Sequence, residues 1–343
     1  MPPKKNDNSA YLQLRRDMKA GEVGRLYVFH GEEKYLMERC LAALKKQLVP
    51  AGMEDFNYRA FDGKGLDLGE LLDAMDALPM MSDRTLLVVN DFDLFGAAEG
   101  AKERLSAAFS DLPDYLCLIF VYDVLEFKIG RGKFQELVKK TGSIVEFAPL
   151  QRSDLMDWVR RRCRVLGKEI ENGEIEYLIF LCGGLMTGLD SEIEKIASYA
   201  KEKTITHADI AALADPVLEA RVFDMTDAVS ARDFVRALRV LSDLYGLNQH
   251  PIMILSILGR HLRQLYTARL TLESGKGAPG LMEMWNMKTS WQANRLMQAA
   301  RGCSLEWCRE SVRLAGEADL AMKSTGRDAE EVLTDLLLRL ANG

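Results

Sequence analysis

The sequence lacks the long apolar run that a membrane-spanning helix needs, and it lacks closely paired cysteines. None of its apolar stretches approaches the ~20 consecutive residues that cross a bilayer. Its six cysteines are scattered and none forms a C-x-x-C pair, so neither a zinc site nor a redox motif is indicated. We expect buried, reduced cysteines in a cytoplasmic protein that has no membrane partner.

Signals for catalysis and for cofactors are also sparse. The chain has four histidines, and none has a cysteine or carboxylate partner at metal-ligand spacing, so we predict no metal site. The sequence contains no G-x-x-x-x-G-K-[ST] motif, the loop that wraps the phosphates of a bound nucleotide. We therefore predict no catalytic residue and no cofactor.

The overall charge excludes a basic protein that coats nucleic acid. The chain has 343 residues and a net charge of −6, with 48% hydrophobic and 28% charged residues, which is typical of a soluble protein of two or three domains. The charge is uneven, because residues 250–301 hold seven basic residues and only two acidic ones. A local basic stretch in an acidic chain is more informative than the total.

The first part of the chain, residues 20–150, alternates between strand-like and helical patterns. Short apolar strands are predicted at residues 25–30, 57–63, 85–91, 115–123 and 143–149. Near-continuous apolar strands with helices between them favour a parallel sheet that is covered on both faces. We predict an α/β domain over residues 1–150, preceded by a frayed tail, "MPPKKNDNSA", that lacks the apolar region of a signal peptide.

The rest of the chain is predicted to be helical. Residues 151–215 contain three or four short helical patterns, the first beginning with Ser153 as its cap and the last capped by Thr206. Residues 216–343 show apolar residues at i, i+3 and i+4 throughout. We predict a small helical domain followed by a larger all-α domain.

The turn after the first strand does not suit a nucleotide. "RLYVFH" is followed by Gly31-Glu32-Glu33-Lys34, without a second glycine and with two carboxylates where phosphate anions would lie. Asp91 and Asp93 follow a later strand, where an ATPase would place its magnesium-binding acids. Without the loop lysine these acids have no phosphate to serve, so we expect solvated acids and no ATP binding.

The order of these segments resembles the delta subunits of bacterial DNA polymerase III, the clamp-opening members of the clamp loader. The resemblance covers nearly the whole chain, and it depends on the order and spacing of pieces that are weak singly. These pieces are "YVFHGEEKYLMER", "LLDAMDALPMMSDRTLLVVND", "SIVEFAPL", "LDSEIEKIASYA", "TITHADI", "VFDMTDAV", "GEADLAMKS" and "EEVLTDLLLRL". It implies an AAA+-like α/β domain without an ATP site (1–150), a small helical lid (151–215) and a helical collar domain (216–343) that packs with sister subunits.

One candidate site is the loop "ALPMMSDR", residues 77–84. Pro79 ends a helix here, and Met80 and Met81 then lie at a loop tip, where apolar side chains commonly mark a partner surface. The resemblance implies that Leu78, Pro79, Met80 and Met81 insert into a pocket of the sliding clamp (beta). Family members often have aromatic residues here, so the methionines are a departure. The alternative is that both methionines pack under the sheet.

A second candidate site is Lys288, Trp291 and Arg295, which would share one face of a helix. A tryptophan beside two cations can stack on a base while the cations meet phosphates. The resemblance places this helical domain near the primer–template junction, so we predict contact with DNA in the assembled complex. The alternative is a core-facing tryptophan with ordinary solvated cations.

The function that the resemblance implies is not enzymatic. The chain would be a cytoplasmic subunit of the DNA polymerase III holoenzyme that binds the sliding clamp and helps to open it for loading at primed DNA. Sister subunits would supply the energy of ATP, so no intrinsic ATPase activity is expected. Two alternatives remain open: an active AAA+ ATPase, and a free-standing DNA-binding or repair adaptor.

Overall fold

A computed structural model of the chain describes residues 8–287 and 290–342. Its contacts divide the chain into two compact units. The first unit ends at Gln151 and also takes in Leu185–Thr187, and the second comprises the remaining residues. The finer division of the helical part into residues 151–215 and 216–343 stays a prediction.

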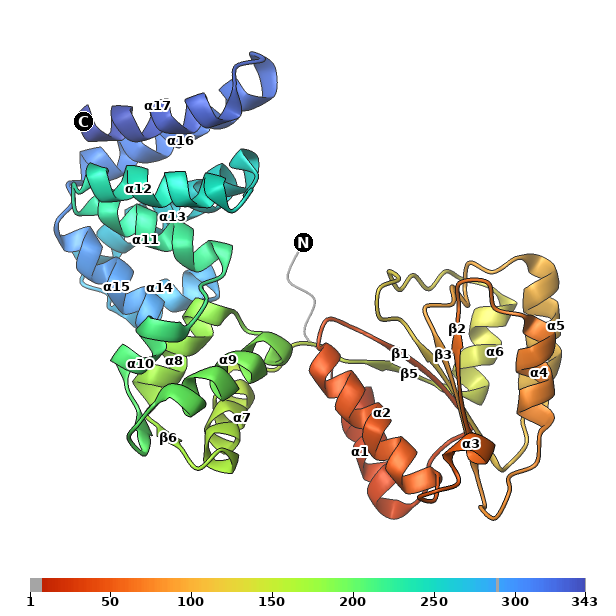
Figure 1. The fold of residues 1–343 in the computed structure, drawn as a ribbon. Coiled ribbons are helices and arrows are strands. Elements are labelled where there is room, and N and C mark those ends of the chain that lie inside the picture. Colours follow the sequence, from red (N-terminus) through yellow and green to blue (C-terminus); the bar gives the residue numbers. More distant parts are fainter. Residues whose placement is uncertain (1–7, 288–289, 343) are drawn as a thin grey trace. The chain divides into compact units, whose positions relative to one another are not determined.

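The first unit is a five-stranded sheet with helices on both faces (Figure 1). Its strands are β1 (Leu26–His30), β2 (Tyr58–Asp62), β3 (Thr85–Asn90), β4 (Leu116–Val121) and β5 (Ser143–Glu146). They stand in the order β2-β3-β4-β1-β5, and every pairing is parallel. Its helices are α1 (Ser9–Ala20), α2 (Lys34–Leu48), α3 (Glu54–Asn57), α4 (Leu68–Asp76), α5 (Glu99–Ser110) and α6 (Lys133–Thr141). The predicted α/β domain with a parallel sheet is confirmed.

Burial on both faces explains why the strands read as unbroken apolar runs. β4 lies at the centre of the sheet, between β1 and β3, and all of its residues are buried. Successive side chains of a strand point to opposite faces. Leu118 and Phe120 thus pack on one side of the sheet, and Cys117 and Ile119 pack on the other. Each face has its own apolar core, so neither set of positions can be polar.

Helix α1 was not predicted, and it begins inside the segment that we expected to be a frayed tail. It buries Leu14 in the core on one face of the sheet. Just before it, the side-chain amide of Asn8 donates to the carbonyl of Ala148 at 3.0 Å and accepts from the Ala148 N–H at 2.9 Å. These partners lie 140 residues apart, so a local pattern gives no sign of them. Residues 1–7 lie outside the described residues.

The second unit is built from helices and one short parallel strand pair (Figure 1). The strands are β6 (Glu169–Ile170) and β7 (Thr204–Ile205), neither of which was predicted. The helices are α7 (Arg152–Val165), α8 (Asn172–Cys182), α9 (Met186–Tyr199), α10 (His207–Leu213), α11 (Leu218–Ser230), α12 (Phe234–Gly246), α13 (Pro251–Glu273), α14 (Ala278–Trp285), α15 (Ser290–Arg301), α16 (Leu305–Ser324) and α17 (Ala329–Asn342). The helical character of this part is confirmed.

One of the two predicted helix caps is wrong and the other is confirmed. α7 begins at Arg152, so Ser153 lies in its first turn instead of preceding it. Thr206 caps α10 through a reciprocal pair of hydrogen bonds with Asp209, a capping box. Each bond satisfies a polar group that would otherwise lack a partner at the helix start.

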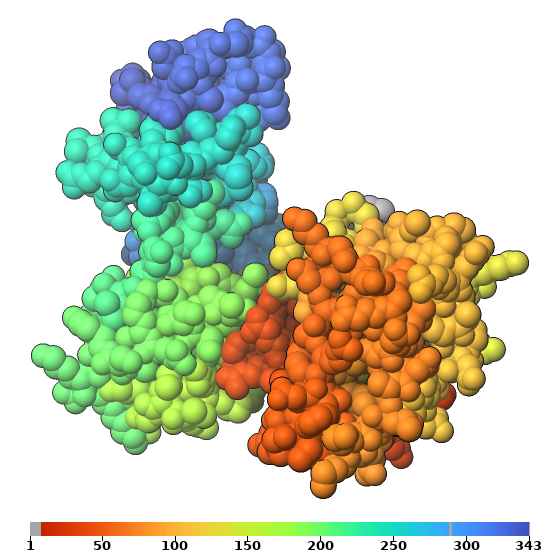
Figure 2. Space-filling model, turned by 45° about the vertical axis from the view of Figure 1, so that its right-hand side comes forward, coloured from red at the N-terminus to blue at the C-terminus, as the bar shows by residue number. Residues whose placement is uncertain are grey.

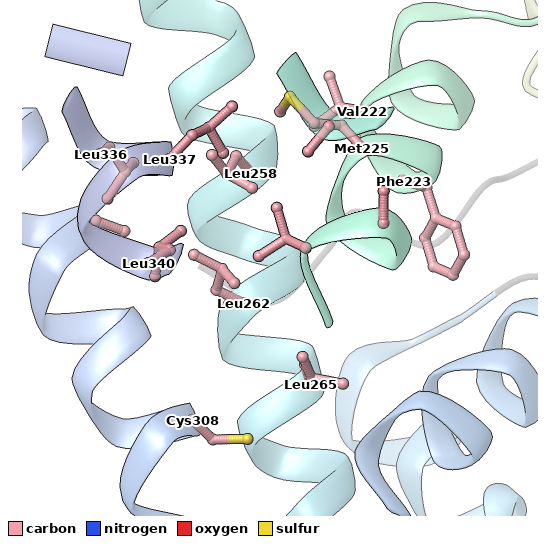
Figure 3. Packing of buried hydrophobic residues seen from close by; sticks show 14 of the residues in the cluster. Val222, Phe223, Met225, Leu258, Leu262, Leu265, Cys308, Leu336, Leu337 and Leu340 are labelled. Atoms are coloured by element: carbon pink, nitrogen blue, oxygen red, sulfur yellow. The ribbon is translucent and has the colours of Figure 1, made fainter. Parts of the chain in front are cut away.

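Helix α13 is the centre of the apolar core of the second unit. Figure 3 shows Leu258, Leu262 and Leu265 of α13 beside Val222 and Met225 of α11 and near the leucines of α17. A helix that is covered on several sides needs apolar residues around most of its circumference. This explains why the apolar pattern of residues 251–273 is broader than that of a surface helix.

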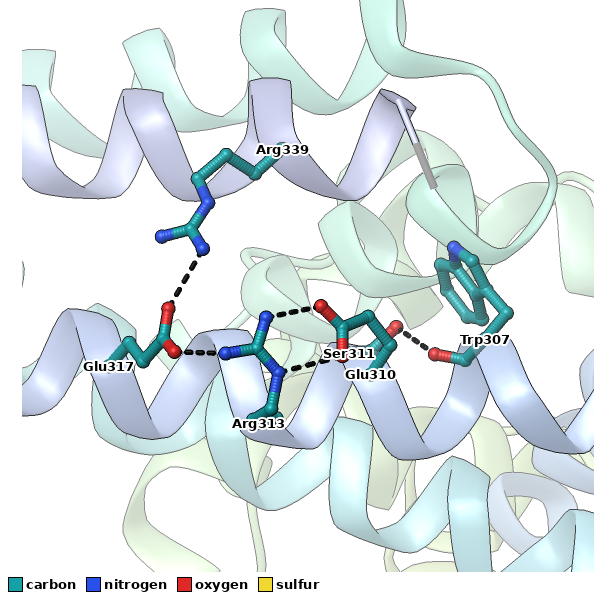
Figure 4. A network of polar contacts seen from close by, with 6 residues as sticks. All are labelled: Trp307, Glu310, Ser311, Arg313, Glu317 and Arg339. Carbon is teal, nitrogen blue, oxygen red and sulfur yellow. Dashed lines mark hydrogen bonds and ion pairs between the residues drawn. The ribbon is translucent and has the colours of Figure 1, made fainter.

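Ion pairs connect the outer helices α16 and α17. Figure 4 shows Arg313 between Glu310 and Glu317, and Arg339 of α17 joined to Glu317 at 2.8 Å. Ion pairs between side chains as exposed as these contribute little to stability, because solvent screens the charges. Apolar burial therefore holds these helices together, and the charges add little.

The cysteines and the helices agree with two expectations from composition. All six cysteines are free, and all but Cys182 are buried. Burial raises the pKa of the Cys117 thiol to about 12, which leaves it protonated and unreactive near neutral pH. No helix in the described part of the chain has the length and apolar character that a membrane span requires.

Candidate protein-binding surface and the turn after the first strand

The turn after β1 is too short and too confined to hold phosphates. Only three residues, Gly31 to Glu33, separate β1 from α2. Gly31 has a φ of +132°, and a Cβ atom there would lie 2.3 Å from the carbonyl oxygen of Phe147. The N–H of Glu33 donates to the same carbonyl at 2.9 Å. The turn thus lies against the segment after β5 and leaves no loop that could wrap a nucleotide.

Lys34 does not take the part of a phosphate-binding lysine. Its Nζ donates to the carbonyls of Tyr122 and Asp123 at 3.1 and 2.5 Å, and it lies 3.3 Å from the Asp123 carboxylate. The ammonium group thus binds the two backbone carbonyls that follow β4, which would otherwise need water as a hydrogen-bond donor. Lys34 therefore has a structural role, in which it joins the start of α2 to the segment after β4.

The two acids after β3 both accept backbone hydrogen bonds. Asp91 is partly buried, which was not expected, whereas Asp93 is exposed as predicted. The carboxylate of Asp91, a residue with a φ of +51°, accepts the three N–H groups of residues 123–125 at 2.8–2.9 Å. Asp93 accepts from the N–H of Gly96 at 2.9 Å. No group of three His, Cys, Asp or Glu side chains is placed to hold a metal ion within residues 8–287 and 290–342.

Glu33 makes the turn unfavourable for anions. Its side chain is fully buried. Its carboxylate accepts, at 3.2–3.3 Å, the N–H of Met186, the first residue of α9, whose first two residues group with the first unit. The pKa of this carboxyl is raised to about 7, mainly because the group is buried. The hydrogen bond from the Met186 N–H opposes this rise, and the nearby charge of Glu32 adds to it. Surroundings that disfavour one carboxylate charge would disfavour the charges of a triphosphate more strongly.

The loop between α4 and β3 presents a group of exposed apolar side chains. α4 ends at Asp76, and the loop then exposes 77% of Leu78, 50% of Met80 and 81% of Met81, while Pro79 is partly buried. The alternative in which both methionines pack under the sheet is therefore wrong. Large apolar side chains gathered on one loop are typical of a partner surface.

The backbone of this loop is fixed although its side chains are exposed. The buried side chain of Asn57 donates to the Met80 carbonyl and accepts from the Met80 N–H, both at 2.8 Å. At the other end of the loop, the guanidinium of Arg84 donates at 2.9–3.1 Å to the carbonyls of Val23, Gly24 and Leu116. A loop that is ordered in advance loses less conformational entropy when a partner binds.

Local sequence patterns gave no signal for the residues that hold the loop. Asn57 lies 23 residues from Met80, and Arg84 lies 60 and 61 residues from Gly24 and Val23. In the sequence, a buried asparagine whose side chain bonds to a distant backbone cannot be told from any other polar residue at the end of a helix. The four residues Leu78 to Met81 were found because large apolar side chains follow a helix-ending proline, and because the family resemblance implies a clamp contact there.

In the second unit, Trp291 packs against three aromatic rings. It is half-buried, and its ring centroid lies 4.4, 5.2 and 6.1 Å from those of Phe180, Tyr177 and Phe223. Arg295 is paired with Asp227 at 2.6 Å and lies over the Trp291 ring. Lys288 lies outside the described residues. These contacts favour the alternative of a packed tryptophan, and DNA binding by the three residues stays a prediction.

Replacing Trp291 with alanine is expected to destabilise the second unit by about 2 kcal/mol, below the range for a fully buried ring because this one is half-buried. Trp291→Phe should lose much less stability, because it keeps an aromatic ring between Phe180 and Phe223. Urea unfolding can be followed by the fluorescence of the other three tryptophans, Trp158, Trp285 and Trp307, all in the second unit. An unchanged midpoint together with weaker DNA-dependent clamp loading would favour the DNA contact instead.

The comparisons with known families agree on one assignment. The family model described as DNA polymerase III, delta subunit, matches residues 27–147, and the model of the C-terminal domain of the same delta protein matches residues 219–340. Together these matches span well over half of the chain. They fall in the α/β part and in the helical part, as the order of sequence pieces implied.

Individual relatives match over nearly the full length. The chain is 24% identical over 336 residues to the DNA polymerase III subunit delta of Bacillus subtilis, with 95% of each chain covered. It is 26% identical over 325 residues to the probable DNA polymerase III subunit delta of Aquifex aeolicus, with 91% and 90% covered.

Two solved structures are also similar. The Bacillus subtilis DNA clamp loader delta protein is 22% identical with a TM-score of 0.49, covering 97% of this chain and 99% of that one. The RuvB Holliday junction branch migration motor of Thermotoga maritima is 14% identical with a TM-score of 0.40, covering 63% and 73%. On the evidence of the family models and the full-length relatives, this chain belongs to the DNA polymerase III delta subunit family.

Proposed function

We propose that the chain is the clamp-loader subunit that binds the sliding clamp and helps to open its ring for loading at primed DNA. The observation that carries this proposal is the loop of Leu78, Met80 and Met81, which is exposed, apolar and fixed by buried hydrogen bonds. In a member of the delta family, such a loop is best explained by a pocket on the clamp.

The mechanism needs no chemistry in this chain. If the loop binds the open clamp more tightly than the closed one, the ratio of open to closed rings rises by the ratio of the two affinities. The energy of ATP would come from sister subunits, because the short turn at Gly31 and the buried Glu33 do not suit a triphosphate.

Assembly would use the second unit. It exposes large apolar side chains on several helices, among them Val235, Met253 and Leu320, which suits packing with the helical domains of sister subunits. In that cytoplasmic complex the chain would lie near primer–template DNA, with Lys288, Trp291 and Arg295 as the predicted contact. No cofactor is proposed.

The test uses the purified chain and the sliding clamp from the same organism. Surface plasmon resonance should give saturable clamp binding, while calorimetry with ATP and Mg²⁺ should give no saturable heat. A micromolar dissociation constant for ATP would favour the alternative of an active ATPase. Tight DNA binding by the isolated chain, without clamp binding, would favour a DNA-binding adaptor instead.

A further inference from the structure

A second exposed apolar side chain belongs to the same end of the sheet as the loop of residues 78–81. Phe56 of α3 is 58% exposed and directly precedes Asn57, whose side chain holds Met80. Figure 1 shows α3 at the end of the sheet where β2 and β3 begin. Because β2 and β3 are neighbouring parallel strands, the segments that lead into them must meet at one end of the sheet.

The two segments present one surface because Asn57 joins them. Its two hydrogen bonds to Met80, each 2.8 Å long, fix the backbone of the loop to the end of α3. We call Phe56, Leu78, Met80 and Met81 the docking surface. In Figure 2 the orange segments, which the colour bar gives as roughly residues 50–100, form much of the visible face of the first unit. A partner that receives the two methionines is therefore also close to the end of α3 that carries Phe56.

The two segments that carry the docking surface, residues 54–57 and 76–84, hold four exposed carboxylates. Glu54, Asp55, Asp76 and Asp83 are exposed, and none of them has an ion-pair partner within the described part of the chain. The one cation in these segments, Arg84, is bound to three backbone carbonyls. Four unpaired carboxylates around apolar side chains suit a partner whose apolar pocket is bordered by lysine or arginine.

We propose that Phe56 is a second apolar anchor for the sliding clamp, and that the clamp surface it meets is apolar with a cationic border. This inference rests on the proposed function. A stable interface typically covers about 800 Å² on each partner and some 20 residues, more than one short loop can supply, so contact must spread to adjoining elements. Buried aromatic residues are frequent among the side chains that dominate such interfaces.

The test compares Phe56→Ser with Val124→Ser in clamp binding by surface plasmon resonance. Val124 is 88% exposed and follows β4, at the opposite end of the strands, so it controls for loss of an exposed apolar side chain. Phe56→Ser should weaken binding about tenfold, mainly through faster dissociation, whereas Val124→Ser should bind as wild type. Phe56→Leu should recover most of the affinity, and circular dichroism checks the fold.

The charged border is tested by neutralisation. Glu54→Gln with Asp55→Asn should slow association and flatten its dependence on salt, because steering acts chiefly on the encounter. Glu32→Gln with Glu103→Gln removes the same charge from exposed positions at the other end of the strands and should change association less. Equal effects of the two pairs would show only a general effect of net charge and would overturn the cationic border.

The outcomes separate this inference from the proposed function. If Met80→Ser with Met81→Ser abolishes clamp binding while Phe56→Ser binds as wild type, the loop alone makes the contact and Phe56 is not an anchor. If neither change affects binding to the clamp, the docking surface as a whole is wrong.

Discussion

Clamp binding is expected to weaken at least about tenfold when Met80 and Met81 are changed together to serine, since about 1.4 kcal/mol corresponds to a factor of ten. Burying one methionine side chain is worth about 1.5–3 kcal/mol, so the pair can supply several kcal/mol before the costs of ordering. Both side chains are exposed in the free chain, so the double substitution should cost the folded state little stability. The backbone bonds of Met80 to Asn57 do not involve the replaced side chain.

The measurement is surface plasmon resonance against the cognate sliding clamp, with circular dichroism as the folding check. Met253→Ser with Met284→Ser is the matched control, because these methionines are exposed to a similar extent in the second unit. The control should bind the clamp like wild type, and the Met80 and Met81 variant should still assemble with sister subunits. A folded variant with undiminished clamp affinity would show that the loop is not the contact and that the proposed mechanism is wrong.

Glu33→Gln is expected to change how the stability of the first unit depends on pH. Burial raises the folded-state pKa of Glu33 from 4.5 to about 7. Below the unfolded value both states are protonated and the stabilisation is complete. It is lost progressively as the pH rises from about 4.5 through about 7, because over this range the unfolded state releases the proton that the folded state keeps. Relative to Glu33→Gln, wild type should therefore lose roughly 2–3 kcal/mol between pH 4.5 and 8.5, at about 1.4 kcal/mol per pKa unit.

Hydrogen exchange of peptides from β1 and β4 suits this measurement. All four tryptophans lie in the second unit, so their fluorescence would not report on the first. The variant and wild type are compared at each pH, which cancels the titration of other groups. Glu32→Gln serves as the control, because Glu32 is exposed and its loss should leave most of the pH dependence. If the stability of wild type and Glu33→Gln stays parallel from pH 4.5 to 8.5, Glu33 does not ionise as a buried group.

Several features of this protein were determined by short stretches of sequence alone. The apolar runs that became β1, β3 and β4 predicted a parallel sheet, because only strands covered on both faces are apolar at every position. The absence of a phosphate-binding loop could also be read directly from the sequence. The segment of Leu78 to Met81 was found because apolar residues after a helix-ending proline have no obvious place in a core. These features are local, so the sequence carries them directly.

Other features were decided only by tertiary contacts. The surroundings of Trp291 are one example, because Phe180 and Phe223 approach from other helices and pack against its ring. Asp91 looks like a solvated acid, but the loop after β4 brings three N–H groups to it. In each case the partner lies tens of residues away, and no periodic pattern records which distant group will meet a given side chain.

The docking surface depends both on the local sequence and on tertiary contacts. Its methionines could be named from the sequence, yet the sequence could not tell that Asn57 fixes Met80, or that Phe56 would stand beside the loop. That arrangement exists because β2 and β3 pair in parallel, which brings the segments before them together. The sequence by itself determined which side chains are apolar and where the chain turns. Only the folded sheet decided which of them lie side by side, because strand pairing joins residues that are distant in the chain.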